Sequence, residues 1–337
     1  MNRVALTVLA LCVSIHGFSI SDTKRACVNS IIETLVKCEF STAFRKIDSL
    51  TECMPTDPIG PFLKTYGIGL KDLDLDFKSD PSGFMESYNT TLSLITALET
   101  DTDTTSYTIT LRGFTKATYA AYSLRNKEYG AAVQVGLEAI KELRRAQELD
   151  PANSDADLFL GLYDYAKGEL RKQLWWVLFW FPGSKEQGIR RLENASRNSE
   201  ISSLGAKLML LDIYSTEKMF EKGRRLLAEL EAKYPSSRYI LWSKGKYYKE
   251  TGKYGNAEKV FGELCTAYRT IPQSGRSLLS AQNKRAHMLF SGGKYIAAAK
   301  VCKEILQRAE SWDDPRVQEI KKDTEKLLKE IGRHGKN

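Results

Sequence analysis

The chain has 337 residues, 42% of them hydrophobic and 27% charged, a composition that supports a buried core and excludes a disordered chain. Its formal net charge of +8 is spread along the sequence, and no run of five or more Lys and Arg residues occurs. A polybasic binding tract is therefore excluded, and we expect no nucleic-acid partner.

The N-terminus has the pattern of an export signal. Arg3 supplies a positive charge, residues 4–14 are almost purely apolar, and residues 17–19 (Gly-Phe-Ser) offer small side chains where a signal peptidase cleaves. The apolar run is too short for a membrane anchor, which needs about 20 residues. Residues 1–19 are therefore predicted to be a cleaved signal peptide.

A first helical hairpin is predicted over residues 22–54, and it carries the one cysteine pair of interest. Cys27 lies early in the first helix and Cys53 at the end of its antiparallel partner, so the hairpin brings their backbones together. A disulfide between them and a pair of buried free thiols are both open alternatives. No Cys-x-x-Cys motif or Cys/His cluster indicates a metal site.

Helices are expected next at residues 61–76, 82–99 and 105–126. At the end of the first of these, Asp72, Asp74 and Asp76 resemble part of a calcium loop. Phe77 stands where that loop requires Gly, and Gly83 stands where it requires a bidentate Glu. We therefore expect a solvated helix end and not a cation site.

The second half of the chain repeats one spacing of small and bulky residues. Tyr254, Ala257, Phe261 and Leu264 follow at intervals of three, four and three, as one face of a helix does. In a helical hairpin of about 34 residues, the small residue lets two helices approach closely and the bulky ones face the next hairpin. Further copies begin at Phe40, Tyr129, Gly188, Phe220 and Tyr295.

Residues 129–235 also resemble a group of tetratricopeptide-repeat (TPR) proteins that bacteria export. The resemblance rests on Ala-Gln-Glu-Leu-Asp-Pro (146–151), Asp-Ala-Asp (155–157) and Leu-Gly-Leu-Tyr-Asp-Tyr (160–165), followed by an aromatic insert that ends in Pro-Gly. It implies an all-α fold, a right-handed superhelix (α-solenoid) of stacked TPR-like helical hairpins. We accordingly expect an N-terminal helical region at 20–126, an array at 127–332 with a capping C-terminal helix, and a disordered tail at 333–337.

In such arrays the first helix of each hairpin lines the concave face, so the resemblance implies a binding groove there. Its mixture of aromatic and basic side chains suits an extended peptide with acidic character. Packing of the tryptophan within the solenoid is an open alternative. The groove is predicted to contain Tyr239, Trp242, Lys246, Lys249, Asn283, His287 and Phe290.

The aromatic insert at residues 174–181 lies between the two helices of one repeat, the second of which begins at Ser184. Eight apolar residues cannot cross a bilayer as a helix. Trp175, Trp176 and Trp180 cannot all point inward, so at least one is expected at the surface. Buried packing of this connection and a patch that contacts a partner or a membrane surface both stay open.

The sequence contains no recognisable catalytic, cofactor-binding or metal-ligating motif. The favoured function is a non-catalytic scaffold that binds protein or peptide, exported to the periplasm or associated with the cell envelope. The alternative is an envelope enzyme, or an accessory subunit of an envelope enzyme complex, whose site has no sequence signature.

Because a signal peptidase would remove residues 1–19, native protein is expected to begin near Ser19. N-terminal sequencing of protein purified from its own host measures this directly. A native chain that begins at Met1 or Asn2 would contradict the export prediction.

Overall fold

A computed structural model describes residues 21–99, 104–173 and 184–334, and within these ranges every regular element is an α-helix. The helices predicted after the first hairpin occur within a few residues of their expected bounds. The helices are α1 (Asp22–Val36), α2 (Phe40–Cys53), α3 (Ile59–Leu75), α4 (Pro81–Leu98), α5 (Ser106–Arg125), α6 (Tyr129–Leu149), α7 (Asp157–Gln173), α9 (Lys185–Asn198), α10 (Ser203–Thr216), α11 (Phe220–Lys233), α12 (Arg238–Glu250), α13 (Tyr254–Arg269), α14 (Gly275–Ser291), α15 (Tyr295–Ala309) and α16 (Pro315–His334).

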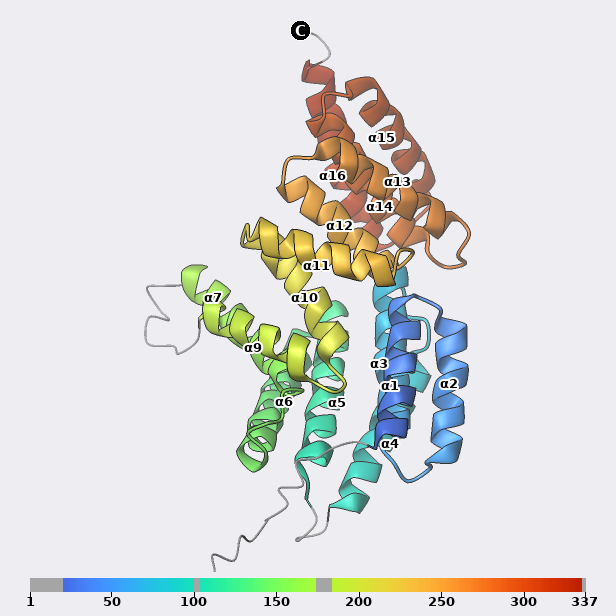
Figure 1. Ribbon diagram of the computed structural model, residues 1–337. Coiled ribbons are helices and arrows are strands. Elements are labelled where there is room, and N and C mark those ends of the chain that lie inside the picture. The colour runs from blue at the N-terminus through green and yellow to red at the C-terminus, as the bar shows by residue number, and fades with distance from the viewer. Residues whose placement is uncertain (1–20, 100–103, 174–183, 335–337) are drawn as a thin grey trace, which may run out of the picture.

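Successive helices pack as hairpins, and the hairpins stack on one another. The pairs are α1 with α2, α3 with α4, α5 with α6, α7 with α9, α10 with α11, α12 with α13 and α14 with α15, while α16 packs on α14 and α15. Figure 1 shows α11–α16 in the upper part of the molecule, α1–α4 beside α5, α6 and α9 in the lower part, and α10 at mid-height between them. The predicted all-α solenoid of TPR-like hairpins is confirmed.

One backbone feature marks the same position in five hairpins. Two residues before the second helix begins, the chain adopts a positive φ of 57–74°, which closes the turn between the helices. An aromatic residue then opens that helix in each of the five. The turn residues are Cys38, Lys127, Lys218, Gly252 and Gly293, and the aromatic residues are Phe40, Tyr129, Phe220, Tyr254 and Tyr295.

Small residues at the repeat positions allow close helix contact, as the spacing predicts. A Cβ atom at Gly245 would lie 2.7 Å from the ring of Phe261 in the next helix. At the crossing of α7 and α9, a Cβ at Gly188 would lie 2.5 Å from the backbone nitrogen of Tyr165 and 2.6 Å from the carbonyl oxygen of Gly161. Glycine is therefore required sterically at this crossing.

The N-terminal hairpins pack back against the later array. Val36, the last residue of α1, is buried in a cluster with Leu211 of α10, Leu230 of α11 and Ile240 of α12. The end of α3 also contacts α14. Helices α1 and α3 of the N-terminal hairpins therefore occupy the side of the array where α10, α11, α12 and α14 meet them.

Cys27 and Cys53 are free and exposed thiols, so neither the disulfide nor the pair of buried thiols predicted for them occurs. The face of α1 that packs against the core carries Val28, Ile31 and Leu35. Cys27 lies four residues before Ile31, at the edge of that face, in the first turns of α1, where its thiol is exposed.

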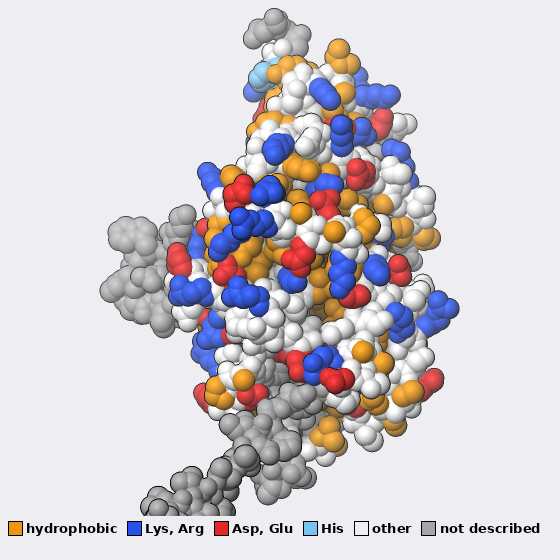
Figure 2. Space-filling model, viewed as in Figure 1, with side chains coloured by type: hydrophobic (Ala, Val, Ile, Leu, Met, Phe, Trp, Pro, Cys, Tyr) orange, Lys and Arg blue, Asp and Glu red, His pale blue; other side chains and the backbone are white. Residues whose placement is uncertain are grey.

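The surface carries charges of both signs. Figure 2 shows Lys and Arg side chains interspersed with Asp and Glu, with hydrophobic side chains between them. Within the described ranges, no helix is long and apolar enough to cross a membrane.

The packing at Gly188 predicts a stability cost for even the smallest side chain. Gly188→Ala is expected to destabilise the protein by about 1–3 kcal/mol, because the methyl group meets backbone atoms that cannot move aside. The matched control is Gly262→Ala in α13, where the nearest atom is the flexible Arg285 side chain at 3.7 Å. The control should raise stability by about 0.5–1 kcal/mol. Urea denaturation measures both, and equal effects would contradict the close crossing.

Candidate functional site

A buried ion pair joins the end of α3 to the start of α12. Arg238 donates to Asp74 through Nε, at 2.9 and 3.0 Å from the two carboxylate oxygens, and through Nη2 at 2.5 Å. The side chain of Asp74 is 1% exposed and that of Arg238 is 13% exposed. Burial alone would lower the pKa of Arg238, but its hydrogen bonds to Asp74 and the nearby negative charge raise it above its ordinary value. Arg238 therefore stays protonated despite its burial.

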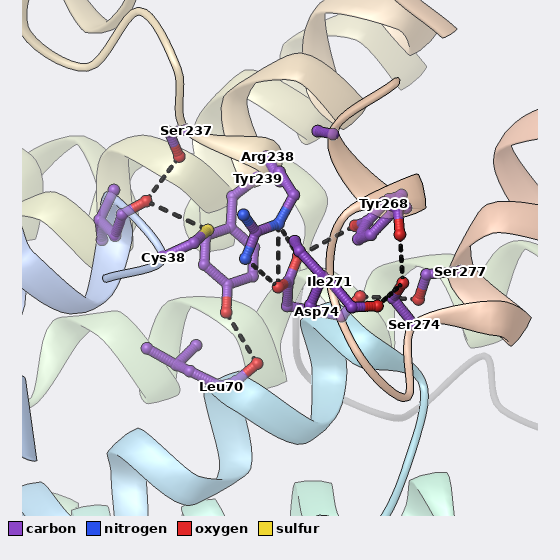
Figure 3. A network of polar contacts seen from close by, with 12 residues as sticks. Cys38, Leu70, Asp74, Ser237, Arg238, Tyr239, Tyr268, Ile271, Ser274 and Ser277 are labelled. Carbon is purple, nitrogen blue, oxygen red and sulfur yellow. Dashed lines mark hydrogen bonds and ion pairs between the residues drawn. The ribbon is translucent and has the colours of Figure 1, made fainter. Parts of the chain in front are cut away.

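Aromatic side chains extend this contact into the next hairpin. The Tyr268 hydroxyl donates to Asp74 at 2.9 Å and accepts from the indole nitrogen of Trp242 at 2.9 Å. Figure 3 shows Arg238 and Tyr268 converging on Asp74 from separate segments. Ser277 of α14 donates to the main-chain carbonyl of Asp74 at 2.7 Å. Side chains from α12, α13 and α14 thus hold the C-terminal end of α3.

This finding corrects the expectation of a solvated helix end. Asp72 is fully buried, and Asp74 is 4% exposed when its backbone is included. Burial raises the pKa of Asp72, whose carboxylate accepts from the backbone nitrogen of Ser79 at 2.7 Å. α3 is buried along most of its length, and its end therefore enters the interior with its carboxylates.

A cleft of about 320 Å³ lies where α1 meets α10 and α11. Three of its lining side chains, Ile32, Ile201 and Leu230, are apolar and almost fully buried. Together they give the cleft an apolar base formed by the first hairpin, the segment before α10, and α11. A chain segment that enters the cleft would contact both the N-terminal hairpin and the array.

Four of the five charged residues that line this cleft are paired with each other, and the fifth, Glu200, contacts Arg25 of α1 at 3.2 Å. Lys233 contacts Glu33 at 2.5 Å and Lys207 contacts Glu229 at 2.6 Å. The hydrogen bond with Lys233 lowers the pKa of Glu33, and the same bond raises the pKa of Lys233. The rim is therefore charged but locally balanced, and these half-exposed pairs can exchange their partners at small cost.

The structure engages three of the predicted groove residues within the chain. Tyr239 donates to the carbonyl oxygen of Leu70 in α3 at 2.7 Å. Trp242 packs edge-on against Phe261 and bonds to Tyr268, which is the alternative of packing within the solenoid. Asn283 is 4% exposed and donates to Thr324 of α16 at 3.1 Å.

The other four groove residues lie nearer the surface. His287 contacts Asp323 of α16 at 2.8 Å, and Phe290 packs against Tyr295 and His334. Lys246 and Lys249, on α12, lie 3.7 Å from Asp212 and 3.2 Å from Glu250. The seven residues thus divide among contacts with α3, with α13, with α16 and with solvent, and they do not form one open groove.

Two further predictions have different outcomes. Trp175, Trp176 and Trp180 lie outside the described residues, and Ser184 does begin a helix as expected, accepting from the backbone nitrogen of Gln187.

In the part of the chain that the structure describes, no group of three or more His, Cys, Asp or Glu residues could hold a metal ion.

Cys38 lies beside the ion pair, partly buried, at one of the positive-φ turns. Burial raises the pKa of its thiol to about 12, with the nearby Asp74 carboxylate adding to the shift. The thiol therefore stays protonated and packs as a small apolar group.

Sequence reasoning missed the central contact because its partners are 164 residues apart. One indication was present. Asp74 lies in the last turn of a helix that is mostly apolar, with Ile59, Leu63 and Ile68 all buried, so a carboxylate at its end had to be either solvated or paired. The sequence alone contains no information on which cation would pair with it.

Comparison with known proteins agrees with a TPR protein. Residues 177–311, about two fifths of the chain, match the family described as Iml2/Tetratricopeptide repeat protein 39. The crystal structure of yeast Tom70 has 12% sequence identity and a TM-score of 0.38, with 89% of this chain and 60% of that one covered, so the chain spans less than two thirds of that protein. The TPR domain of P58(IPK) has 12% identity and a TM-score of 0.22, with 90% and 98% covered. No curated protein sequence matches.

Removal of the buried carboxylate should leave Arg238 charged and unpaired. Asp74→Ala is expected to lower the free energy of unfolding by about 3–5 kcal/mol. The matched control is Asp48→Ala, which removes an exposed carboxylate 3.9 Å from Lys64 and should cost less than about 1 kcal/mol. Urea denaturation measures both values, and similar costs at the two sites would show that Asp74 does not hold the hairpins together.

Proposed function

We propose that this chain is a protein-binding scaffold whose partner inserts a segment into the cleft between α1, α10 and α11. The observation that carries the proposal is the cleft itself, with its apolar base and its rim of paired charges. Stacked helical hairpins give long, rigid surfaces, and such surfaces suit contacts with an extended segment. The proposal assigns the chain no catalytic step.

The chemistry of the cleft defines the partner segment. Ile32, Ile201 and Leu230 would receive one or two apolar side chains, each of which gains about 1.5–3 kcal/mol when it is covered. Lys207 and Lys233 would each bond to an acidic side chain of the partner when they leave Glu229 and Glu33. The proposed partner is therefore an extended segment with apolar residues between charged ones, consistent with the mixed charges in Figure 2.

This proposal moves the main contact away from the predicted concave groove. Tyr239, Trp242 and Asn283 already bond within the chain, and separating them from α3, α13 and α16 would expose buried polar groups. Lys246 and Lys249 of the predicted groove keep exposed ammonium groups on α12. They form a second, weaker contact for an acidic partner segment in the proposal.

The cellular place of the scaffold is a separate part of the proposal. Export to the periplasm or cell envelope is supported by the charged and apolar pattern of residues 1–19, and a bacterial host by the resemblance over residues 129–235. A peripheral contact with a membrane surface is supported by Trp175, Trp176 and Trp180 with the basic residues beside them. Export, a bacterial host and membrane contact are independent of the binding cleft, so evidence against any of them would leave the binding proposal unchanged.

A photo-crosslinking amino acid at Asn29, which lines the cleft, tests the binding proposal in cells. Partner protein should be captured at Asn29 and not at Lys300, an exposed residue of α15. Adding Lys207→Glu and Lys233→Glu should reduce capture at Asn29 at least about tenfold, because two attractive charges become repulsive.

The control for charge is Lys300→Glu with Lys303→Glu, which reverses two charges on the outer face of α15. Circular dichroism establishes that both variants fold. Equal capture by the two variants, or crosslinking at Lys300 as strong as at Asn29, would place the partner elsewhere.

A further inference from the structure

A second pocket, of about 480 Å³, opens where four helix ends meet. The residues after α3 and at the end of α5 form one side, and the first residues of α14 and α16 form the other. The pocket therefore spans the junction between the N-terminal hairpins and the end of the array. It is distinct from the cleft between α1, α10 and α11, with which it shares no lining residue.

The lining of this pocket is strongly basic. Five cationic side chains line it, together with one carboxylate, Asp314. Asp76 lies behind the arginines, and Glu319 contacts one lysine at 3.4 Å on the exposed rim. Positive charge exceeds negative charge even with these carboxylates counted, which favours an additional anion. The cationic residues are Lys78, Arg125, Lys127, Arg276 and Arg316.

Two of these arginines share one acceptor. Arg125 and Arg316 both contact the Oδ1 atom of Asp76, and Arg316 also donates to the main-chain carbonyl of Arg125. Burial, and after it the neighbouring Arg316 guanidinium, lower the pKa of Arg125, although Asp76 opposes both effects. Two cations held against a single carboxylate oxygen are incompletely compensated.

The third arginine is fixed in place before any ligand arrives. Arg276 donates to the main-chain carbonyl of Asp76 at 3.0 Å and contacts Asp314 at 2.5 Å. Its guanidinium also lies 6.0 Å from the ring centre of Phe77, which lines the pocket. Lys78 and Lys127 are exposed at the rim and can turn toward a bound molecule. The pocket thus combines fixed guanidinium groups with adjustable ammonium groups.

We propose that this pocket binds a phosphorylated small molecule, with its phosphoryl oxygens against the arginines and the two rim lysines. A volume of about 480 Å³ exceeds what a single phosphate fills and lies in the range of small-molecule sites. Guanidinium groups bind phosphate oxygens in paired hydrogen bonds, and the N-termini of α14 and α16 add positive potential. Phe77 and Pro315 supply an apolar wall for the organic part.

Because the pocket lies between the N-terminal hairpins and the last helices of the array, a bound ligand would stabilise the contact between these two parts of the chain. Binding to the folded state alone raises thermal stability in proportion to the logarithm of ligand concentration. This inference does not depend on the proposed scaffold function, since it uses different residues.

The test uses inorganic pyrophosphate and ADP as probes, without divalent cations, at low ionic strength. Both should raise the melting temperature of the purified protein and bind in isothermal titration calorimetry, while sulfate at equal ionic strength should have a smaller effect. Lys78→Gln with Lys127→Gln should weaken binding of both probes at least about tenfold. These lysines are chosen because Arg276 and Arg316 also hold backbone carbonyls and Arg125 also holds the Asp76 carboxylate.

The matched control is Lys300→Gln with Lys303→Gln, which removes the same charge from α15, outside the pocket. Affinity within about twofold of the unmodified protein is expected for this control. The inference is overturned if neither probe binds, if sulfate acts as strongly as pyrophosphate, or if the two double variants bind equally. Binding of pyrophosphate without ADP would overturn the organic part and leave an inorganic polyanion site.

Discussion

The buried pair of Asp74 and Arg238 is the interaction on which the arrangement of this protein depends. Transfer of two charges from water to the interior is costly, and the cost is offset only where the geometry is good and the remaining lone pairs are bonded. Here the guanidinium contacts both carboxylate oxygens and Tyr268 satisfies a further lone pair. The pair thus contributes more to the specific docking of α3 on α12 than to the net free energy of folding.

That docking determines which surfaces are available for binding. A solenoid of hairpins presents an inner face along its first helices, but α1 and α3 occupy much of this face here. Two of the spaces that stay open lie at the borders between the N-terminal hairpins and the array. The cleft between α1, α10 and α11 has balanced charges, whereas the pocket at α3, α5, α14 and α16 has an excess of positive charge. The cleft and the pocket, which both lie where the N-terminal hairpins meet the array, therefore favour ligands of different chemistry.

The local sequence pattern determined the fold class for a physical reason. Helical periodicity, the aromatic residue that begins the second helix of five hairpins, and a small residue one turn later are all contained within a single hairpin of about 34 residues. Ala257 and Leu264 are fully buried as this spacing requires, and Gly188 lies against backbone as a small residue must. Helix bounds could be predicted to within a few residues because they depend on neighbouring residues alone.

The sequence by itself therefore determined the hairpins and their stacking, and only the tertiary structure decided which surfaces are free. Three contacts depend on the curvature of the whole array: Asp74 with Arg238, Tyr239 with α3, and Asn283 with α16. That curvature is the sum of many small helix-packing angles, and no local pattern contains it. Tyr239 and Asn283, predicted to face a ligand, consequently face the chain's own α3 and α16, while Arg316 of the basic pocket contacts Asp76, 240 positions away.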